Sequence, residues 1–67
     1  MKIKFTEDIK LAVNDYSWGE EYTKQIKSGD VKEVLAIEDN THGYKDIYFA
    51  LKEVAEGVHH SVFTIIS

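Results

Sequence analysis

The N-terminal segment of this chain alternates apolar and polar residues with a period of two. Its large apolar residues all occupy odd-numbered positions: Met1, Ile3, Phe5, Ile9, Leu11 and Val13. Successive side chains of a β-strand point to opposite faces, so this parity places those apolar side chains on one face. The parity continues across the polar residues 6–8. We therefore predict one long strand over residues 1–13 that is bent or interrupted near Glu7.

Two further segments in the middle of the chain have strand character. Residues 31–37 follow a turn at 28–30 and are rich in β-branched side chains. A polar loop at 38–43 separates them from residues 44–51, where apolar and polar residues alternate again. These segments predict two strands joined by a loop.

The C-terminal segment has two interpretations. Residues 58–66 are typical of a strand with a break at 59–61, whereas apolar residues between 51 and 62 also fit a helical stripe. Gly57 lies in the middle of that stripe and would cost a helix about 1 kcal/mol relative to alanine. We therefore favour a hairpin of two strands over the helix.

Residues 14–27 leave two structures open. Ser17 and Glu20 have the spacing of a capping box, and Trp18, Tyr22 and Ile26 follow at intervals of four. This pattern predicts a short helix at about residues 17–27. The same segment also fits a long polar excursion between two strands.

The length of the chain limits its architecture to one domain, residues 1–67. Four or five short strands in so small a domain would expose long sheet edges, and closing the sheet into a barrel removes them. We therefore predict a mainly β fold, a small five-stranded barrel. The alternative is an α+β fold, an antiparallel sheet with the short helix at about residues 17–27.

Composition and charge exclude several classes of function. Twelve acidic and eight basic residues give a net charge of −4, and the sequence contains no arginine, which argues against direct binding to nucleic acid. No cysteine is present for a disulfide or a thiolate metal site. No apolar run is long enough to span a membrane or to form a signal peptide. We expect a cytoplasmic protein.

The residues that could carry catalysis or bind a metal do not occur in suitable patterns. The acidic pairs, such as Glu38 and Asp39, are adjacent in predicted turns, and no glycine-rich phosphate loop is present. His42, His59 and His60 lack a metal-binding spacing, and adjacent histidines in an extended segment point to opposite faces. We predict that the protein is not an enzyme and binds no cofactor or metal.

Three segments resemble SH3 domains. Residues 12–16 (AVNDY) are similar to the ALYDY motif, residues 26–35 (IKSGDVKEVL) to the diverging turn and second strand, and residues 57–63 (GVHHSVF) to the tight turn before the last strand. The same outline is found in short SH3-like proteins encoded by bacteriophages and prophages. The resemblance implies an SH3-like barrel. In that family, an aromatic groove beside an acidic loop binds proline-rich peptides.

The resemblance also implies which residues would form the groove. Tyr16 matches the second tyrosine of the ALYDY motif, and Glu20 and Glu21 fall in the acidic loop. Tyr44 matches the groove tryptophan, and Phe63 matches the final tyrosine. Each of these residues is therefore a candidate for partner binding.

The same comparison reveals departures from the SH3 pattern. Asn14 replaces the first groove tyrosine and His60 replaces the groove proline. Phe63 lacks the hydroxyl group that normally binds the peptide backbone. The resemblance therefore implies the fold more directly than it implies binding of proline-rich peptides.

We predict a non-catalytic protein–protein interaction module, a phage or prophage accessory protein in the host cytoplasm. Its partner would be a host or phage protein. Trp18, the only tryptophan, either binds that partner or packs back onto the barrel. The predicted aromatic–acidic surface consists of Tyr16, Trp18, Glu20, Glu21, Tyr44 and Phe63.

Two other functions remain open at the level of the sequence. One is an acidic inhibitor that imitates nucleic acid and occupies the basic groove of a host nucleic-acid-binding or defence protein. The other is a structural subunit that pairs through a strand at the edge of its sheet. The sequence does not determine the oligomeric state.

Overall fold

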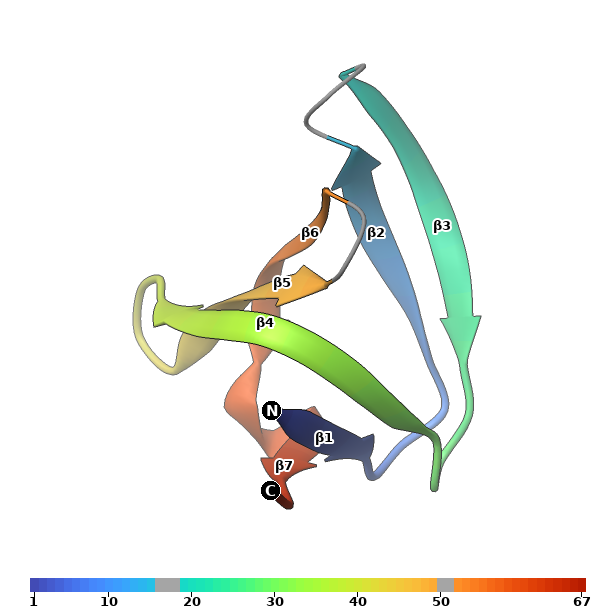
Figure 1. Cartoon of the computed structure of the whole chain (residues 1–67), viewed down its shortest axis with the longest axis vertical. Helices are drawn as coiled ribbons and strands as arrows, with labels where there is room; N and C mark the ends of the chain where they lie inside the picture. The colour runs from blue at the N-terminus through green and yellow to red at the C-terminus, as the bar shows by residue number, and fades with distance from the viewer. Residues whose placement is uncertain (16–18, 50–51) are drawn as a thin grey trace.

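The computed structural model of the chain describes residues 1–15, 19–49 and 52–67 (Figure 1). These residues form seven strands and one 3₁₀ turn, and the prediction of a mainly β fold is confirmed. The elements are β1 (Lys2–Phe5), β2 (Ile9–Asp15), β3 (Glu20–Ile26), β4 (Val31–Asp39), β5 (Tyr44–Phe49), β6 (Glu53–His59), η1 (His60–Val62) and β7 (Phe63–Ile65).

All neighbouring strands are antiparallel, and the sheet order is β3-β2-β6-β5-β4-β1-β7. The described part of the chain thus has seven strands where we expected five. The hydrogen-bonded order begins at β3 and ends at β7 without closing. The count is higher because the first predicted strand is divided into β1 and β2, and because β3 was not predicted as a strand. The C-terminal segment forms two strands as expected, but β6 and β7 are not neighbours in the sheet and so form no hairpin.

The predicted interruption near Glu7 separates β1 from β2. The two strands have different neighbours, since β1 pairs with β4 and β7 whereas β2 pairs with β3 and β6. Their odd-numbered parity is nevertheless preserved, and these side chains are buried: Ile3, Phe5, Leu11 and Val13. Alternation therefore identified the buried face of both strands correctly.

The predicted helix is wrong over residues 20–26, which form β3. The strand pairs residue by residue with β2, from Glu20 opposite Asp15 to Ile26 opposite Ile9. Both faces of this edge strand are largely exposed, so its sequence does not need to alternate apolar and polar residues. Without that alternation, the four-residue spacing of its apolar side chains favoured a helix. Residues 17 and 18, at the start of the expected helix, lie outside the described residues.

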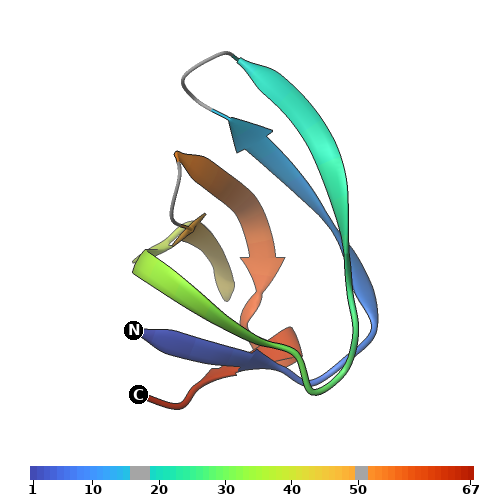
Figure 2. The same ribbon diagram turned by 45° about the vertical axis from the view of Figure 1, so that its right-hand side comes forward.

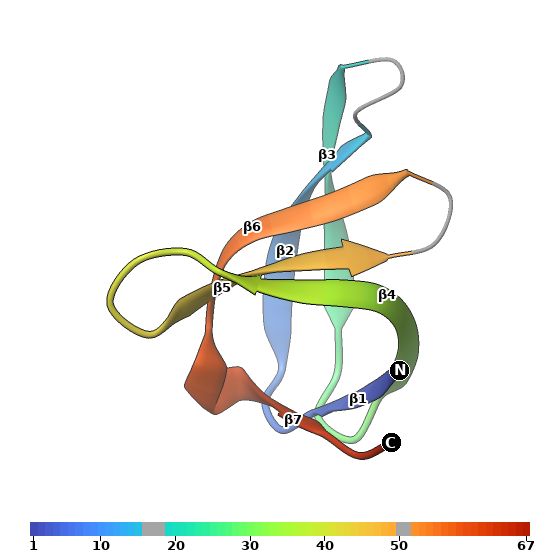
Figure 3. The ribbon, with the colours of Figure 1, turned by 60° about the vertical axis from the view of Figure 1, so that its left-hand side comes forward.

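The sheet curls around one hydrophobic core (Figures 2 and 3). Strand β4 bends so strongly that its first residues pair with β1 and its later residues pair with β5. Each of the seven strands contributes to the core: Ile3, Phe5, Leu11, Val13, Ile26, Val34, Ile47, Phe49, Ala55, Val58 and Phe63. Figure 3 shows β4, β5 and β6 side by side, with the β2–β3 hairpin crossing behind them.

A turn at residues 27–30 links β3 to β4, where the sequence predicted one. Asp30 donates its backbone N–H to the carbonyl of Lys27 (3.0 Å), and its carboxylate accepts the N–H of Lys27 (3.0 Å). Gly29 adopts φ +94°, a conformation that glycine tolerates without steric cost. The N–H of Gly29 donates to the carbonyl of Phe5 (2.7 Å), so the turn also holds the end of β1.

Candidate interaction groove between strands β2 and β6

Strands β2 and β6 pair over only a short length and then separate. Val13–Asp15 pairs with Glu53–Ala55, and no further pairing between the two strands is present in the described residues. Beyond this point lies an open depression of about 370 Å³, which we call the β2–β6 groove. Its lining residues are Ile9, Lys10, Leu11, Ala12, Tyr44, Glu56, Gly57, Val58, His59 and Val62.

A bulge in β6 explains why the strands diverge. The register between β5 and β6 shifts between Lys45 and Ile47, opposite the stretch that contains Gly57. Gly57 has φ +69°, and its N–H donates to the Asp46 carboxylate (3.1 Å), which also accepts a bond from the Asn40 side-chain amide (2.9 Å). A bulge bends its strand and increases the local twist. The bend turns β6 away from β2 and opens the groove.

The floor of the groove is apolar and its sides are charged. Leu11 and Val58 are buried, and Val62 packs against the core from η1. Lys10 and Glu56 are exposed and line the groove from β2 and β6 respectively. This combination, an apolar floor with a few polar groups at the margin, is typical of surfaces that bind a ligand or a partner segment.

Aromatic side chains form one end of the groove. The exposed fraction of Tyr44 is 42%, and the His59 ring meets it edge-on with 5.1 Å between ring centroids. His59 in turn stacks on His60, with centroids 4.5 Å apart. The prediction that His59 and His60 point to opposite faces is wrong, because the extended backbone ends at His59 and turns into η1 at His60. Of these two stacked histidines, His59 lines the groove.

The orientation of the His59 ring is fixed by a helix cap. The backbone N–H of Ser61 donates to His59 Nδ1 (3.2 Å), and Ser61 Oγ lies 2.7 Å from the same nitrogen. Because Nδ1 accepts a bond from a backbone N–H, the neutral ring carries its proton on Nε2. The cap thereby orients the His59 ring against Tyr44.

The described residues of the predicted aromatic–acidic surface do not gather at one place. Tyr16 and Trp18 lie outside the described residues. Glu20 and Glu21 are exposed at the start of β3, in a strand where the resemblance implied an acidic loop. Tyr44 is exposed at the start of β5.

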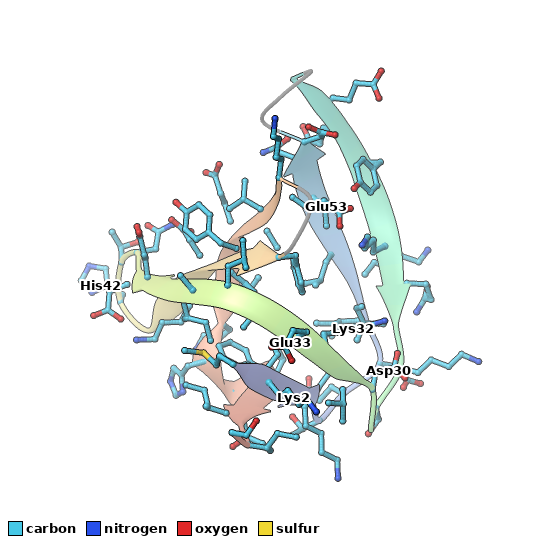
Figure 4. The ribbon with its side chains drawn as sticks, in the orientation of Figure 1. Lys2, Asp30, Lys32, Glu33, His42 and Glu53 are labelled. Atoms are coloured by element: carbon cyan, nitrogen blue, oxygen red, sulfur yellow. The ribbon has the colours of Figure 1, made fainter. Side chains whose placement is uncertain are left out.

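Strand register shows that Glu20 and Tyr44 lie far apart. Glu20 is opposite Asp15, which is in turn opposite Glu53, the first residue of β6. Tyr44 is opposite His59, the last residue of β6. Six residues of extended strand correspond to about 20 Å. In Figure 4, Glu53 accordingly lies beside the β2–β3 hairpin, and His42 marks the β4–β5 end.

Phe63 belongs to the core. Its exposed fraction is 9%, and its ring packs against that of Phe5 with 6.3 Å between centroids. The edge of Phe63 reaches a second depression, of about 520 Å³, together with Met1 and Ile65. Phe63 therefore shares no surface with Tyr44 in the groove.

Sequence reasoning missed most of the groove residues. Leu11 and Val58 were expected in strands, with nothing to mark them as part of an opening, and Glu56 was not singled out. The available signal was Gly57, because a glycine inside a strand pattern often marks a bulge. That residue was used only to argue against a helix.

Asp39 and Lys45 form an ion pair near the surface. Hydrogen bonding and the positive charge of Lys45 hold the pKa of the exposed Asp39 carboxyl below its ordinary value. Among the described residues, no three His, Asp or Glu side chains are grouped so that they could hold a metal ion. The same part of the chain contains no helix with the length and hydrophobicity to cross a membrane.

Comparison of the chain with protein-family models, with curated proteins and with solved structures finds no match. A proposal for the function therefore rests on the geometry of the chain.

Proposed function

We propose that this protein is a non-catalytic protein-interaction module that binds an extended segment of a partner protein in the β2–β6 groove. The observation that carries the proposal is the separation of β2 from β6 beyond Val13 and Ala55, which leaves a depression with an apolar floor between the two strands. An extended segment matches the shape of such an opening, because it can lie along the strands and direct alternate side chains onto Leu11 and Val58.

The margins of the groove would supply specificity. Tyr44 offers a large, rigid contact area at low entropic cost, and its position against His59 limits its motion. Lys10 and Glu56 carry opposite charges on the two sides, which favours a partner segment with charges in one orientation. Glu56 is the only carboxylate among the described lining residues, so these residues offer no pair of carboxylates.

We further propose an SH3-like arrangement of the strands, and three features support it. The turn at 27–30 coincides with the segment that resembles the diverging turn. Residues 12–15 of the segment that resembles the ALYDY motif form the end of β2, and β3 follows them as the second strand of a hairpin. The 3₁₀ turn η1 directly precedes the last strand, where the resemblance implied a tight turn. A phage or prophage source stays a prediction from the resemblance alone.

The alternative, an acidic mimic of nucleic acid, has weaker support. Such a mimic needs unpaired carboxylates spaced over an extended face, whereas several acidic side chains here pair with cations. Glu53 accepts a bond from Lys24 (2.9 Å), Asp39 from Lys45, and Glu33 from the N-terminal amine (3.2 Å). Pairing of this kind reduces the negative potential that a basic groove would recognise.

A peptide-display selection tests the groove directly. We expect a library of random extended peptides to yield binders to the wild type whose affinity falls at least about tenfold, or 1.4 kcal/mol, in Tyr44→Ala. Tyr22→Ala is the matched control, since Tyr22 has a similar exposed fraction (38% against 42%) but lies on β3. Binding is measured by calorimetry and mapped by NMR chemical-shift changes.

Two results would count against the proposal. Binders that perturb residues outside the groove, or that bind Tyr44→Ala as tightly as the wild type, would remove its basis. Affinity for a basic protein that falls steeply with salt and is unaffected by Tyr44→Ala would favour the nucleic-acid mimic.

A further inference from the structure

Strand β3 presents a long, unpaired edge. Within the described sheet its single neighbour is β2, and Figures 1 and 2 show no other segment alongside its outer side. The strand contains seven residues, whereas β7 at the other end of the sheet contains three. Six of the seven residues of β3 are exposed or half-buried.

This edge lacks most of the features that protect edge strands from pairing. Proteins usually protect an edge with charged side chains, with proline, with a bulge, with a very short strand or with a covering segment. Of these, β3 has the charged side chains Glu20, Glu21 and Lys24. The chain contains no proline, and the β2–β3 register runs from Ile9 opposite Ile26 to Asp15 opposite Glu20 without a shift. A regular, uncovered strand of this length can accept a further strand.

The side chains of β3 suit a second copy of the same strand. Glu20, Tyr22 and Lys24 share one face, the face of the buried Ile26, because they alternate with Glu21, Thr23 and Gln25. An acid, an aromatic and a base are therefore evenly spaced on that face. Such a sequence is complementary to itself when it is read in the opposite direction.

We propose that two copies of the protein associate through antiparallel pairing of their β3 strands about a two-fold axis at Tyr22. In this register Tyr22 lies opposite Tyr22 of the second copy, and Glu20 lies opposite Lys24 of the second copy. The symmetry produces that ion pair twice, so the dimer combines one aromatic pair with two opposite-charge pairs.

A competing register is less favourable. Directly opposed side chains of an antiparallel pair lie on the same face of the sheet. A two-fold axis perpendicular to the sheet therefore passes between two copies of one residue, and that residue lies opposite itself. Centring on Thr23 would place Tyr22 opposite Lys24 and Glu21 opposite Gln25. That arrangement contains no ion pair, and the Tyr22-centred register is therefore the one that charge complementarity selects.

Within the chain, Lys24 reaches across β2 to Glu53 on β6, so pairing with Glu20 of a second copy requires its ammonium group to share its donors or to turn toward the outer edge of β3. Its Nζ donates to Glu53 Oε1 (2.9 Å) and lies 5.7 Å from the centre of the Phe49 ring. A lysine ammonium group has three donors, so the bond to Glu53 leaves two for a carboxylate of the second copy. Lys24 is about four-tenths exposed, which keeps the ammonium group accessible.

Disulfide trapping tests the register, and the chain is suited to it because it contains no cysteine. Residues that face themselves across the axis can form a disulfide, whereas residues displaced from the axis cannot reach each other. We expect Tyr22→Cys to form covalent dimers at least about tenfold faster than Thr23→Cys and than the exposed control Lys10→Cys. Fastest trapping of Thr23→Cys, or equal rates in all three variants, would overturn the proposal.

Sedimentation equilibrium of the unmodified chain provides the second test. We expect concentration-dependent dimerisation that weakens about tenfold in Glu20→Lys and in Lys24→Glu, and that recovers in the double variant, where the opposed charges are exchanged. Circular dichroism verifies that each variant is folded. Strictly monomeric wild-type protein at millimolar concentration, or a double variant no better than the singles, would contradict the interface. Tyr44→Ala, which tests the β2–β6 groove, should leave dimerisation unchanged, so the two proposals can fail separately.

Discussion

Strands β1 and β3 show how differently two strands of one sheet can be held. β1 has four residues and pairs on both sides, and its Ile3 and Phe5 are fully buried. β3 has seven residues, pairs on one side within the described sheet, and buries only Ile26. The shorter strand is therefore the more firmly anchored of the two. In a small domain, neighbours and burial determine the stability of a strand more than its length does.

The surroundings of β1 and β3 extend this contrast. The C-terminal residues contribute a further hydrogen bond to β1, in which Ile66 donates its N–H to the carbonyl of Lys2 (2.9 Å). On its other side, Lys2 lies beside Glu33 of β4 (Figure 4). Beyond its ladder to β2, β3 has the Lys24–Glu53 ion pair and the turn at 27–30. β1 is thus part of the core structure, while β3 is an extension that remains available for other contacts.

The largest expected effect on stability comes from truncating a core side chain of β1. Phe5→Ala removes a fully buried ring that packs against Phe63, and we expect it to cost about 3–5 kcal/mol of unfolding free energy. Tyr22→Ala on β3 should cost less than about 1 kcal/mol, because the side chain is 38% exposed. Urea denaturation of both variants measures the difference. Equal losses would show that β3 is as firmly anchored as β1.

Removing the cation that joins β3 to the body should have the next largest effect. Lys24→Met keeps an apolar stem near Phe49 but leaves the Glu53 carboxylate, 15% exposed, without its ion pair. We expect a loss of about 1 to 1.5 kcal/mol in unfolding free energy. Adding Glu53→Gln to Lys24→Met removes the unpaired charge and should restore part of the stability. If the double variant recovers no stability, the unpaired Glu53 carboxylate is not the cause of the loss in Lys24→Met.

A bond between the ends of the two strands should contribute less. The Asp8 carboxylate, after β1, accepts the backbone N–H of Ser28, after β3 (2.7 Å). Asp8→Ala should lower the unfolding free energy by about 0.5–1 kcal/mol, since both residues are exposed and water replaces part of the bond. Asp8→Asn keeps an acceptor oxygen and should be closer to the wild type. Thermal unfolding measures both variants, and identical melting temperatures for Asp8→Ala and wild type would contradict the contact.

The smallest expected effect concerns Asp39, which lies in neither strand of the comparison. Lys45 lowers the pKa of Asp39 from its ordinary value of 3.8 by hydrogen bonding and by its charge. A folded-state pKa that is lowered stabilises the protein above the unfolded-state value, and this contribution disappears as pH falls through the folded-state pKa. Lys45→Met should raise the pKa of Asp39 toward 3.8 in an NMR titration of its carboxyl carbon. The signals of β1 and β3 should not change, and an unaltered Asp39 titration would refute the pairing.

Alternation predicted the parts of the fold that face the core. The parity of Ile3, Phe5, Leu11 and Val13 identified the buried faces of β1 and β2, because burial on one face requires every second residue to be apolar. The turn at 27–30 was also predictable, since Gly29 and Asp30 have the chemistry that a tight turn requires. Local signals were sufficient in both cases.

The remaining features depend on contacts that local signals do not contain. β3 shows no alternation, since its pairing with β2 is backbone hydrogen bonding with little burial. The β2–β6 groove arises from a bulge in β6. Gly57 signals such a bulge but does not indicate from which neighbouring strand β6 separates. Phe63 was placed on a binding surface by its match to a motif, but it completes the core through its contact with Phe5.

Amide hydrogen exchange at two protein concentrations tests most directly whether β1 is core and β3 is an open edge. We predict that the amides of β1 exchange slowly and at the same rate at both concentrations, because global unfolding limits them. The amides of β3 should exchange faster in dilute solution and become protected at high concentration as two β3 strands pair. Exchange in β3 that is as slow as in β1 in dilute solution, and independent of concentration, would contradict this account.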